Sequence, residues 1–168
     1  TIAAVAIVSV ALFGSANAKT LKIETHFTAS SPNGEVAAQF AKNVEMFSGG
    51  SLKVQMFYSS SVSGKSAEVF NSAQTGIIDC DMTGAGYQTG KNAAFQFAGD
   101  VMGGYDNPYQ QYDFLKFPGA QDAVDALYNK YGMTLIGWWI PGHESLISSK
   151  AIPDVASIKD FKFRSPPG

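Results

Sequence analysis

The stretch AKNVEMFSGGSLKVQMF, which runs from Ala41 to Phe57, decides the fold. Its first half repeats apolar residues at the spacing of a helix with one buried face. Gly49 and Gly50 then end that helix, because glycine tolerates the left-handed backbone found at helix C-termini. From Leu52 onward apolar and polar residues alternate, which is typical of a strand with one buried face. A helix followed at once by such a strand indicates an α/β protein.

The same elements recur on both sides of this stretch. A strand is predicted over residues 21–27 and leads, through a polar turn, into the helix over about 35–47. A second helix over about 65–75 follows strand 52–58, and a third strand is predicted over 77–82. The order strand, helix, strand, helix, strand predicts a parallel sheet with right-handed crossovers. The apolar stripe of the first helix consists of Val36, Phe40, Val44 and Phe47.

Further elements follow toward the C-terminus. Helices are predicted over about 108–115 and 120–131, and a strongly apolar strand over 133–140. Two more strands are predicted over 144–149 and 161–164. The sequence has no internal repeat and no low-complexity linker.

The segment Phe161–Arg164 alternates apolar and basic residues before Ser165-Pro166-Pro167-Gly168 stops the strand. Arg164 is therefore expected at the carboxyl end of a strand, which is where open α/β sheets bind their ligands. A guanidinium group there can bind a carboxylate through two parallel hydrogen bonds. The alternative is a surface arginine in an ion pair, since most arginines are exposed.

Length and composition limit the class of protein. The chain has 168 residues, which is enough for one domain with a real core. Its hydrophobic content of 45% and charged content of 15% are ordinary for a globular protein. A net charge of −2 gives no indication of a nucleic-acid-binding surface.

The N-terminal residues have the pattern of a targeting signal. Ile2–Phe13 is an almost continuous apolar run that is too short to span a bilayer comfortably. Ala16-Asn17-Ala18 matches the small-x-small cleavage pattern. Residues 1–18 are therefore predicted to be a secretory signal peptide, truncated at its start and cut before Lys19. The alternative is an N-terminal membrane anchor.

No catalytic motif is present in the sequence. Cys80 is the single cysteine, which excludes a disulfide framework and a cysteine-based zinc site. Asp79 and Asp81 would share one face of a strand, but Asp79 opens it and is expected to be solvated. The sequence has no nucleophile elbow, Walker loop, Rossmann fingerprint or HExxH motif, and GAGYQTG (Gly84–Gly90) resembles a phosphate loop only loosely.

Five segments in a fixed order carry a family resemblance. They are the first strand with its loop from Phe27 to Pro32, AKNVEMFSGGSLKVQMF, FNSAQTGIIDCDMT (Phe70–Thr83), GMTLIGWW (Gly132–Trp139) and SSKAIPDVASIKDFKFRSPPG (Ser148–Gly168). No single segment is specific, but the ordered set is. The chain resembles the solute-binding proteins of tripartite ATP-independent periplasmic (TRAP) transporters, of the C4-dicarboxylate-binding type.

The resemblance implies an α/β fold of the periplasmic binding protein-like architecture, with two lobes around a cleft. Residues 19–142 would form lobe one, and 143–168 the crossing strand and the start of lobe two, with the remainder missing from an N-terminal fragment. The implied protein is a periplasmic receptor, not an enzyme, that was secreted through the inner membrane by its signal peptide. It would bind a small organic acid and deliver it to the membrane subunits of a TRAP permease. The resemblance leaves a homodimer open.

The resemblance also assigns site residues. Arg164 holds the place of the family's main carboxylate-binding arginine. Strand ends that would line the cleft contribute further candidates, which are His26, Thr83, Tyr87 and Trp139. Three of them have a plainer alternative: His26 as a hydrogen-bonded loop residue, Tyr87 as a cover over the core, and Trp139, together with Trp138, as a core residue.

His143 and Glu144 depart from the pattern of many relatives, which have an arginine at or next to Glu144. An acid there puts a dicarboxylate ligand in doubt and favours a 2-oxo or 2-hydroxy monocarboxylate. Relatives with such ligands can hold a cation beside them, so Glu144 is a candidate ligand of Na⁺ or Ca²⁺. The alternative is that Glu144 points to solvent.

Two other classes of function remain as alternatives. An exported α/β enzyme such as a hydrolase would use His26 or His143 as a base, with a Ser or Asp partner within hydrogen-bond reach. The sequence offers no motif for such a partner. A purely structural envelope protein is disfavoured by the ordered family segments.

Overall fold

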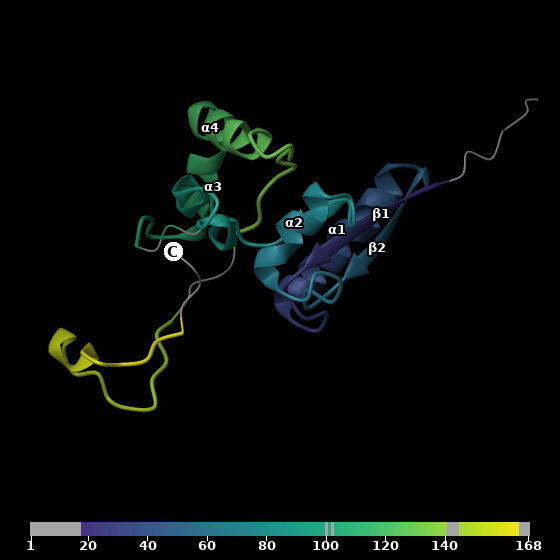
Figure 1. Cartoon of the computed structure of the whole chain (residues 1–168). Coiled ribbons are helices and arrows are strands. Elements are labelled where there is room, and N and C mark those ends of the chain that lie inside the picture. The colour runs from purple at the N-terminus through teal and green to yellow at the C-terminus, as the bar shows by residue number, and fades with distance from the viewer. Residues whose placement is uncertain (1–17, 100, 102, 141–144, 165–168) are drawn as a thin grey trace, which may run out of the picture.

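A parallel sheet lies at the centre of the N-terminal half of the molecule (Figure 1). The computed structural model describes residues 18–99, 101, 103–140 and 145–164. Within them the strands are β1 (Lys19–Thr25), β2 (Leu52–Phe57) and β3 (Cys80–Met82), in the order β2-β1-β3. Both pairings are parallel. The parallel sheet predicted from the order of elements is therefore confirmed.

Helix α1 (Pro32–Phe47) connects β1 to β2. It begins where the Ser31 hydroxyl accepts a hydrogen bond of 3.1 Å from the backbone N–H of Gly34, as a helix cap should. Ala37 and Ala41 are buried, while Val36 and Phe47 are 51% and 79% exposed. The helix thus buries its small residues, and the ends of the predicted apolar stripe lie at the surface.

The helix between β2 and β3 is shorter than predicted. A 3-10 turn, η1 (Ser66–Glu68), continues into α2 (Val69–Gln74). Val69 and Phe70 are fully buried and form the inward face of this connection. Gly76 follows with a positive φ of 77°, a conformation in which glycine avoids the strain of a side chain.

A second group of elements follows β3. It contains η2 (Ala85–Gln88), η3 (Ala93–Phe97), α3 (Pro108–Lys116) and α4 (Pro118–Asn129), and Figure 1 shows α3 and α4 beyond α2, on the side away from β2. One core cluster joins both groups and consists of Phe70, Ala85, Phe95, Ala98, Val124 and Leu127. The helices predicted over 108–115 and 120–131 are confirmed within a few residues.

The strands predicted over 133–140, 144–149 and 161–164 are not formed in the described residues. An apolar pattern indicates that one face of a segment is buried. It does not show whether a neighbouring strand is present to hydrogen-bond with the segment, and a strand requires one. Ile136 and Ile147 are accordingly 73% and 91% exposed. Figure 1 shows the segment 145–164, with η4 (Val155–Ile158) at its far end, extending away from the sheet and helices.

Several predictions fall on residues that the structure does not describe. The predicted signal peptide, apart from Ala18, is among them, and so is the predicted lobe boundary at 142. Among the described residues, no helix combines the length and the apolar character that a membrane crossing needs.

Candidate functional site

The carboxyl ends of β1 and β3 lie side by side, because the two strands are parallel and Thr25 pairs with Met82. His26 follows β1 directly, and Thr83 follows β3 directly. The structure therefore brings these two predicted site residues to one edge of the sheet. This edge corresponds to the position at which open α/β sheets bind ligands.

An aromatic group, defined as His26, Phe27, Tyr87 and Trp139, lies at the same edge. The ring centroids of His26 and Tyr87 are 5.3 Å apart in an edge-on arrangement, and those of His26 and Phe27 are 3.9 Å apart. Trp139 joins through Phe27, with a centroid distance of 5.6 Å. Aromatic side chains in such a position provide apolar surface and exclude water from neighbouring charges.

The two tryptophans have different surroundings. Trp138 packs against the core cluster, whereas Trp139 contacts Phe27 of the aromatic group. Neighbouring residues of an extended segment point in opposite directions, which explains the separation. The arrangement agrees with the choice of Trp139 as the candidate, although contact with a ligand stays a prediction.

His26 is half-buried and carries the electrostatic signature of the site. Burial lowers the pKa of its imidazole, and the positive charge of Arg164 lowers it further. A histidine in this environment is neutral at neutral pH, because its unperturbed pKa is already near 6.5. Its Nδ1 atom is buried and has no hydrogen-bond partner in the described part of the chain.

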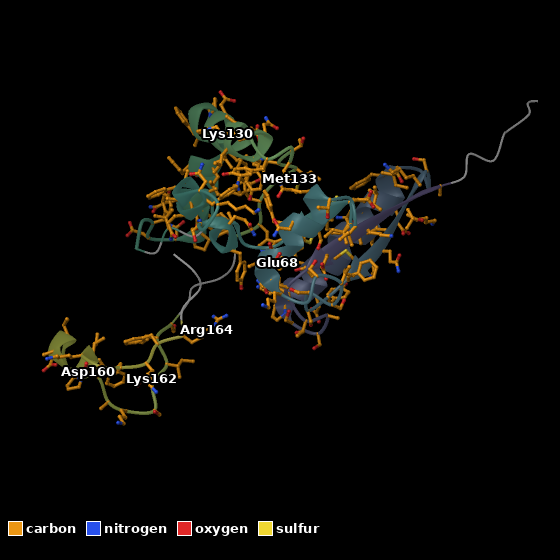
Figure 2. The ribbon with its side chains drawn as sticks, viewed as in Figure 1. Glu68, Lys130, Met133, Asp160, Lys162 and Arg164 are labelled. Carbon is orange, nitrogen blue, oxygen red and sulfur yellow. The ribbon has the colours of Figure 1, made fainter. Side chains whose placement is uncertain are left out.

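Arg164 is exposed, and its charge acts on the end of β1. Figure 2 shows it where the C-terminal segment returns toward the rest of the molecule, with Lys162 and Asp160 farther out in this view. The ion pair recorded among the described residues joins Lys53 and Glu45, not Arg164. No strand forms over residues 161–164, so the predicted place of Arg164 at a strand end is wrong, and its role as the carboxylate-binding residue stays a prediction.

Glu24 is a buried carboxylate that sequence reasoning missed. Its side chain is fully buried and accepts hydrogen bonds from the backbone N–H groups of Val62, at 2.6 Å, and Ser63, at 3.2 Å. The hydroxyl of Ser63 donates a further hydrogen bond to the same carboxylate. Glu24 thereby fixes the loop after β2 against β1. The only signal in the sequence was a charged residue inside a predicted strand.

Asp81 is the second carboxylate that the sequence did not assign to the site. It lies opposite Glu24 in the register of β1 and β3. Burial raises the pKa of Asp81 to about 6, hydrogen bonding from the hydroxyl and the backbone N–H of Thr83 opposes this, and the charge of Glu24 adds to it. Oδ1 of Asp81 and Oγ1 of Thr83 are both buried without a hydrogen-bond partner in the described chain. Asp79, by contrast, is exposed as predicted and accepts a hydrogen bond from the backbone N–H of Lys22 at 2.8 Å.

The remaining candidates lie outside the described residues. His143 and Glu144 are both in the undescribed segment 141–144, so their predicted roles stay predictions. Within the described ranges, no group of three or more His, Cys, Asp or Glu side chains is placed to hold a metal ion.

Comparisons with known proteins identify the family and the fold. A family model described as bacterial extracellular solute-binding protein, family 7, matches residues 23–168. A TRAP periplasmic solute-binding protein from Rhodobacter sphaeroides, in an apo open structure, is 27% identical with a TM-score of 0.64. The match covers 70% of this chain and 37% of that one. No curated protein matches the chain.

Two further solved structures are similar in fold. A TRAP transporter solute-binding protein from Bordetella bronchiseptica RB50, described as a mixed-occupancy dimer with calcium and picolinate in its active site, is 21% identical with a TM-score of 0.61; the match covers 68% of this chain and 34% of that one. A TRAP periplasmic solute-binding protein from Colwellia psychrerythraea, with bound calcium and pyruvate, is 21% identical with a TM-score of 0.60. That match covers 68% of this chain and 35% of the other. The chain thus spans little more than a third of the length of these structures. The α/β, periplasmic binding protein-like fold is confirmed.

Proposed function

Because the chain belongs to family 7 of the bacterial extracellular solute-binding proteins, we propose that the full-length protein is the periplasmic receptor of a TRAP transporter. It binds a small organic acid between two lobes and delivers it to the membrane permease. Residues 1–18 act as the signal peptide for its export. The family is one of binding proteins and not of enzymes, so the exported hydrolase considered from the sequence is set aside.

The proposal rests on one observation, the charge of Arg164 acting on His26 at the carboxyl edge of the sheet. In this proposal the guanidinium binds the ligand carboxylate through two hydrogen bonds. The aromatic group shields this pair from water, which strengthens the attraction. His26 is neutral and can hydrogen-bond the ligand without adding a charge. Thr83 completes the contacts from lobe one.

The proposed ligand is a monocarboxylate with a polar group at C2. Glu144 stands where many relatives have an arginine, and an acid there disfavours a second carboxylate on the ligand. The similar structures from Bordetella and Colwellia hold calcium together with picolinate or pyruvate. By analogy, Glu144 would hold Ca²⁺ or Na⁺ beside the ligand of this protein, since hard cations prefer oxygen ligands. A homodimer, as in the description of the Bordetella structure, is part of the same proposal.

Capture depends on closure of the two lobes. A ligand that touches both lobes only in the closed form shifts the equilibrium toward that form. The closed receptor then docks on the permease. Arg164, in the segment that would lead out of lobe one, would couple binding to closure.

Arg164→Ala in the full-length protein is expected to abolish stabilisation by organic acids in a thermal-shift screen with and without Ca²⁺. Truncating one partner of a desolvated charge pair costs roughly 2–5 kcal/mol of binding free energy. The matched control is Lys162→Ala, which removes a cation two residues away and should leave the thermal shift unchanged. Equal ligand-induced shifts in the wild type and in Arg164→Ala would remove Arg164 from its proposed role.

A further inference from the structure

Four buried side-chain polar atoms lack a hydrogen-bond partner among the described residues, and three of them belong to residues at the carboxyl edge of β1 and β3; the fourth is Nε1 of Trp138. The three at the edge are Oδ1 of Asp81, Oγ1 of Thr83 and Nδ1 of His26. Asp81 and Thr83 are two residues apart, so an extended chain points both to the same face of the sheet. His26 follows Thr25, which pairs with Met82, so it reaches the same edge from the neighbouring strand.

Buried polar atoms in proteins almost always have hydrogen-bond partners, and one without a partner destabilises the fold. An isolated case has many explanations. Three such atoms on adjacent positions of one edge indicate that a polar group from outside the chain completes their hydrogen bonds.

The neighbouring side chains do not supply this group. Glu24 faces Asp81 across the register, but it accepts hydrogen bonds from the backbone N–H groups of residues 62 and 63 and repels a second carboxylate. Tyr128 of α4 lies close enough for the charge of Asp81 to raise its pKa, after the larger effect of burial. Among the described residues, no cation acts on Asp81. Thr83 lies near enough to act on Asp81 as a hydrogen-bond donor, yet Oδ1 of Asp81 still has no partner among the described residues.

We propose that Asp81 and Thr83 form a polar floor that binds a hydrogen-bond donor at C2 of the ligand, so that the receptor selects 2-hydroxy or 2-amino acids over their 2-oxo counterparts. This inference rests on the proposed function, because it places the ligand carboxylate at Arg164. A hydroxyl or ammonium group donates to the Asp81 carboxylate. A keto oxygen only accepts, so it would leave Asp81 unpaired and face its lone pairs. Sites built around a buried hydrogen bond reject ligands that cannot make it.

The protonation of Asp81 adds a second consequence. Its pKa of about 6 leaves it mostly ionised at pH 7.5 and mostly protonated at pH 5. The protonated acid carries an O–H that can donate to a keto oxygen. The preference for hydroxy over oxo acids should therefore shrink as the pH falls through 6. Two groups act on the charge of Asp81, namely Glu24 and Thr83. The same charge acts on Tyr128. His26 follows β1, the neighbouring strand.

The test is calorimetry on the full-length protein with lactate, alanine, propionate and pyruvate, which differ at C2. At pH 7.5 the wild type is expected to bind lactate or alanine about 10- to 100-fold more tightly than propionate or pyruvate, the range for a hydrogen bond to a charged group. Asp81→Asn should bring the lactate-to-pyruvate ratio near or below one, because its amide can also donate to a keto oxygen. Asp79→Asn is the matched control from the exposed end of the same segment and should keep the wild-type ratio.

The outcomes distinguish a failure of the proposed polar floor from a failure of the proposed receptor function. Binding of organic acids with equal affinity for lactate and pyruvate, or a ratio unchanged in Asp81→Asn, would overturn the floor and leave the receptor proposal standing. Binding of no carboxylate by the wild type would overturn both. If Asp81→Asn fails to fold, Thr83→Val provides the comparison, since it removes the other half of the floor; an unchanged ratio there also overturns the inference.

Discussion

Glu24 and Arg164 are both charged residues, and the structure gives them opposite roles. Glu24 is fully buried and binds the loop after β2, so its charge serves the fold. Arg164 is exposed, and its charge acts on His26 across a long separation in sequence. Neither role follows from composition, because the surroundings of a charge decide what it does.

The placement of Arg164 can be tested through the titration of His26. Arg164→Gln is expected to raise the pKa of His26, since the repulsion that disfavours the imidazolium form is removed. NMR titration of the imidazole signals measures this, with a His143→Gln background to leave one histidine. Lys162→Gln is the control and should not move the titration. An unchanged pKa in Arg164→Gln would place the guanidinium far from β1.

At the scale of residues, the sequence predicted which side chains reach the sheet edge, but not which hydrogen bonds the polar side chains there make. His26 and Thr83 could be predicted because the carboxyl ends of parallel strands meet at one edge. The roles of Glu24 and Asp81 could not. The partners of Glu24 are 38 and 39 residues away, in a loop whose path the local pattern does not encode.

At the scale of elements, α1 packs through small residues rather than through its apolar stripe. Gly34, Ala37 and Ala41 are its buried positions. A Cβ atom on Gly34 would lie 2.0 Å from the carbonyl oxygen of Thr28, so the turn before the helix comes very close to it. The helix was predictable from periodicity, whereas its inward face was not, because the space available to a side chain is a property of the packed structure.

Gly34→Ala is therefore expected to destabilise the protein, although alanine is the better helix former. Overpacking of this kind typically costs about 1–3 kcal/mol of unfolding free energy. Gly119→Ala in α4 is the matched control, because there the nearest atom to the new Cβ is the Phe117 ring at 3.6 Å. It should be neutral or stabilising by up to about 1 kcal/mol. Chemical denaturation measures both, and equal effects would contradict the close approach.

The strands predicted after residue 132 show the limit of pattern reading at this scale. Alternation and apolar runs report that a segment will have a buried face. They do not report whether a neighbouring strand is present in the chain. The first three strands were predicted correctly since each finds its partner within the first 82 residues.

At the scale of the molecule, the chain divides into a packed part and an extended C-terminal segment. Residues 19–140 contain the sheet, α1–α4 and the core cluster, while Ile147, Val155 and Leu146 of the later segment are 91%, 84% and 65% exposed. The family resemblance predicts a lobe boundary at residue 142, inside the segment 141–144 that the structure does not describe, so the division into lobes stays a prediction. The chain spans 37% of the Rhodobacter structure.

Hydrogen exchange should separate the two parts. In this chain, amides of β1 are expected to exchange slowest, because the strand has a hydrogen-bonded neighbour on each side. Amides of 145–164 should exchange at nearly intrinsic rates, apart from those in η4. Mass spectrometry of peptides after deuterium exchange measures both. Similar protection in the two segments would show that the C-terminal segment packs on the rest.

The central position of β1 has a consequence for how the chain folds. β1 is the first strand to be synthesised, yet β3, which pairs with its second edge, ends only at Met82. Until the exported chain has emerged from the membrane as far as that residue, one side of β1 has no backbone to pair with, and closing so long a loop is slow. A chain whose export halts within α2 would hold an open strand edge, the feature on which chaperones and unwanted self-association both act.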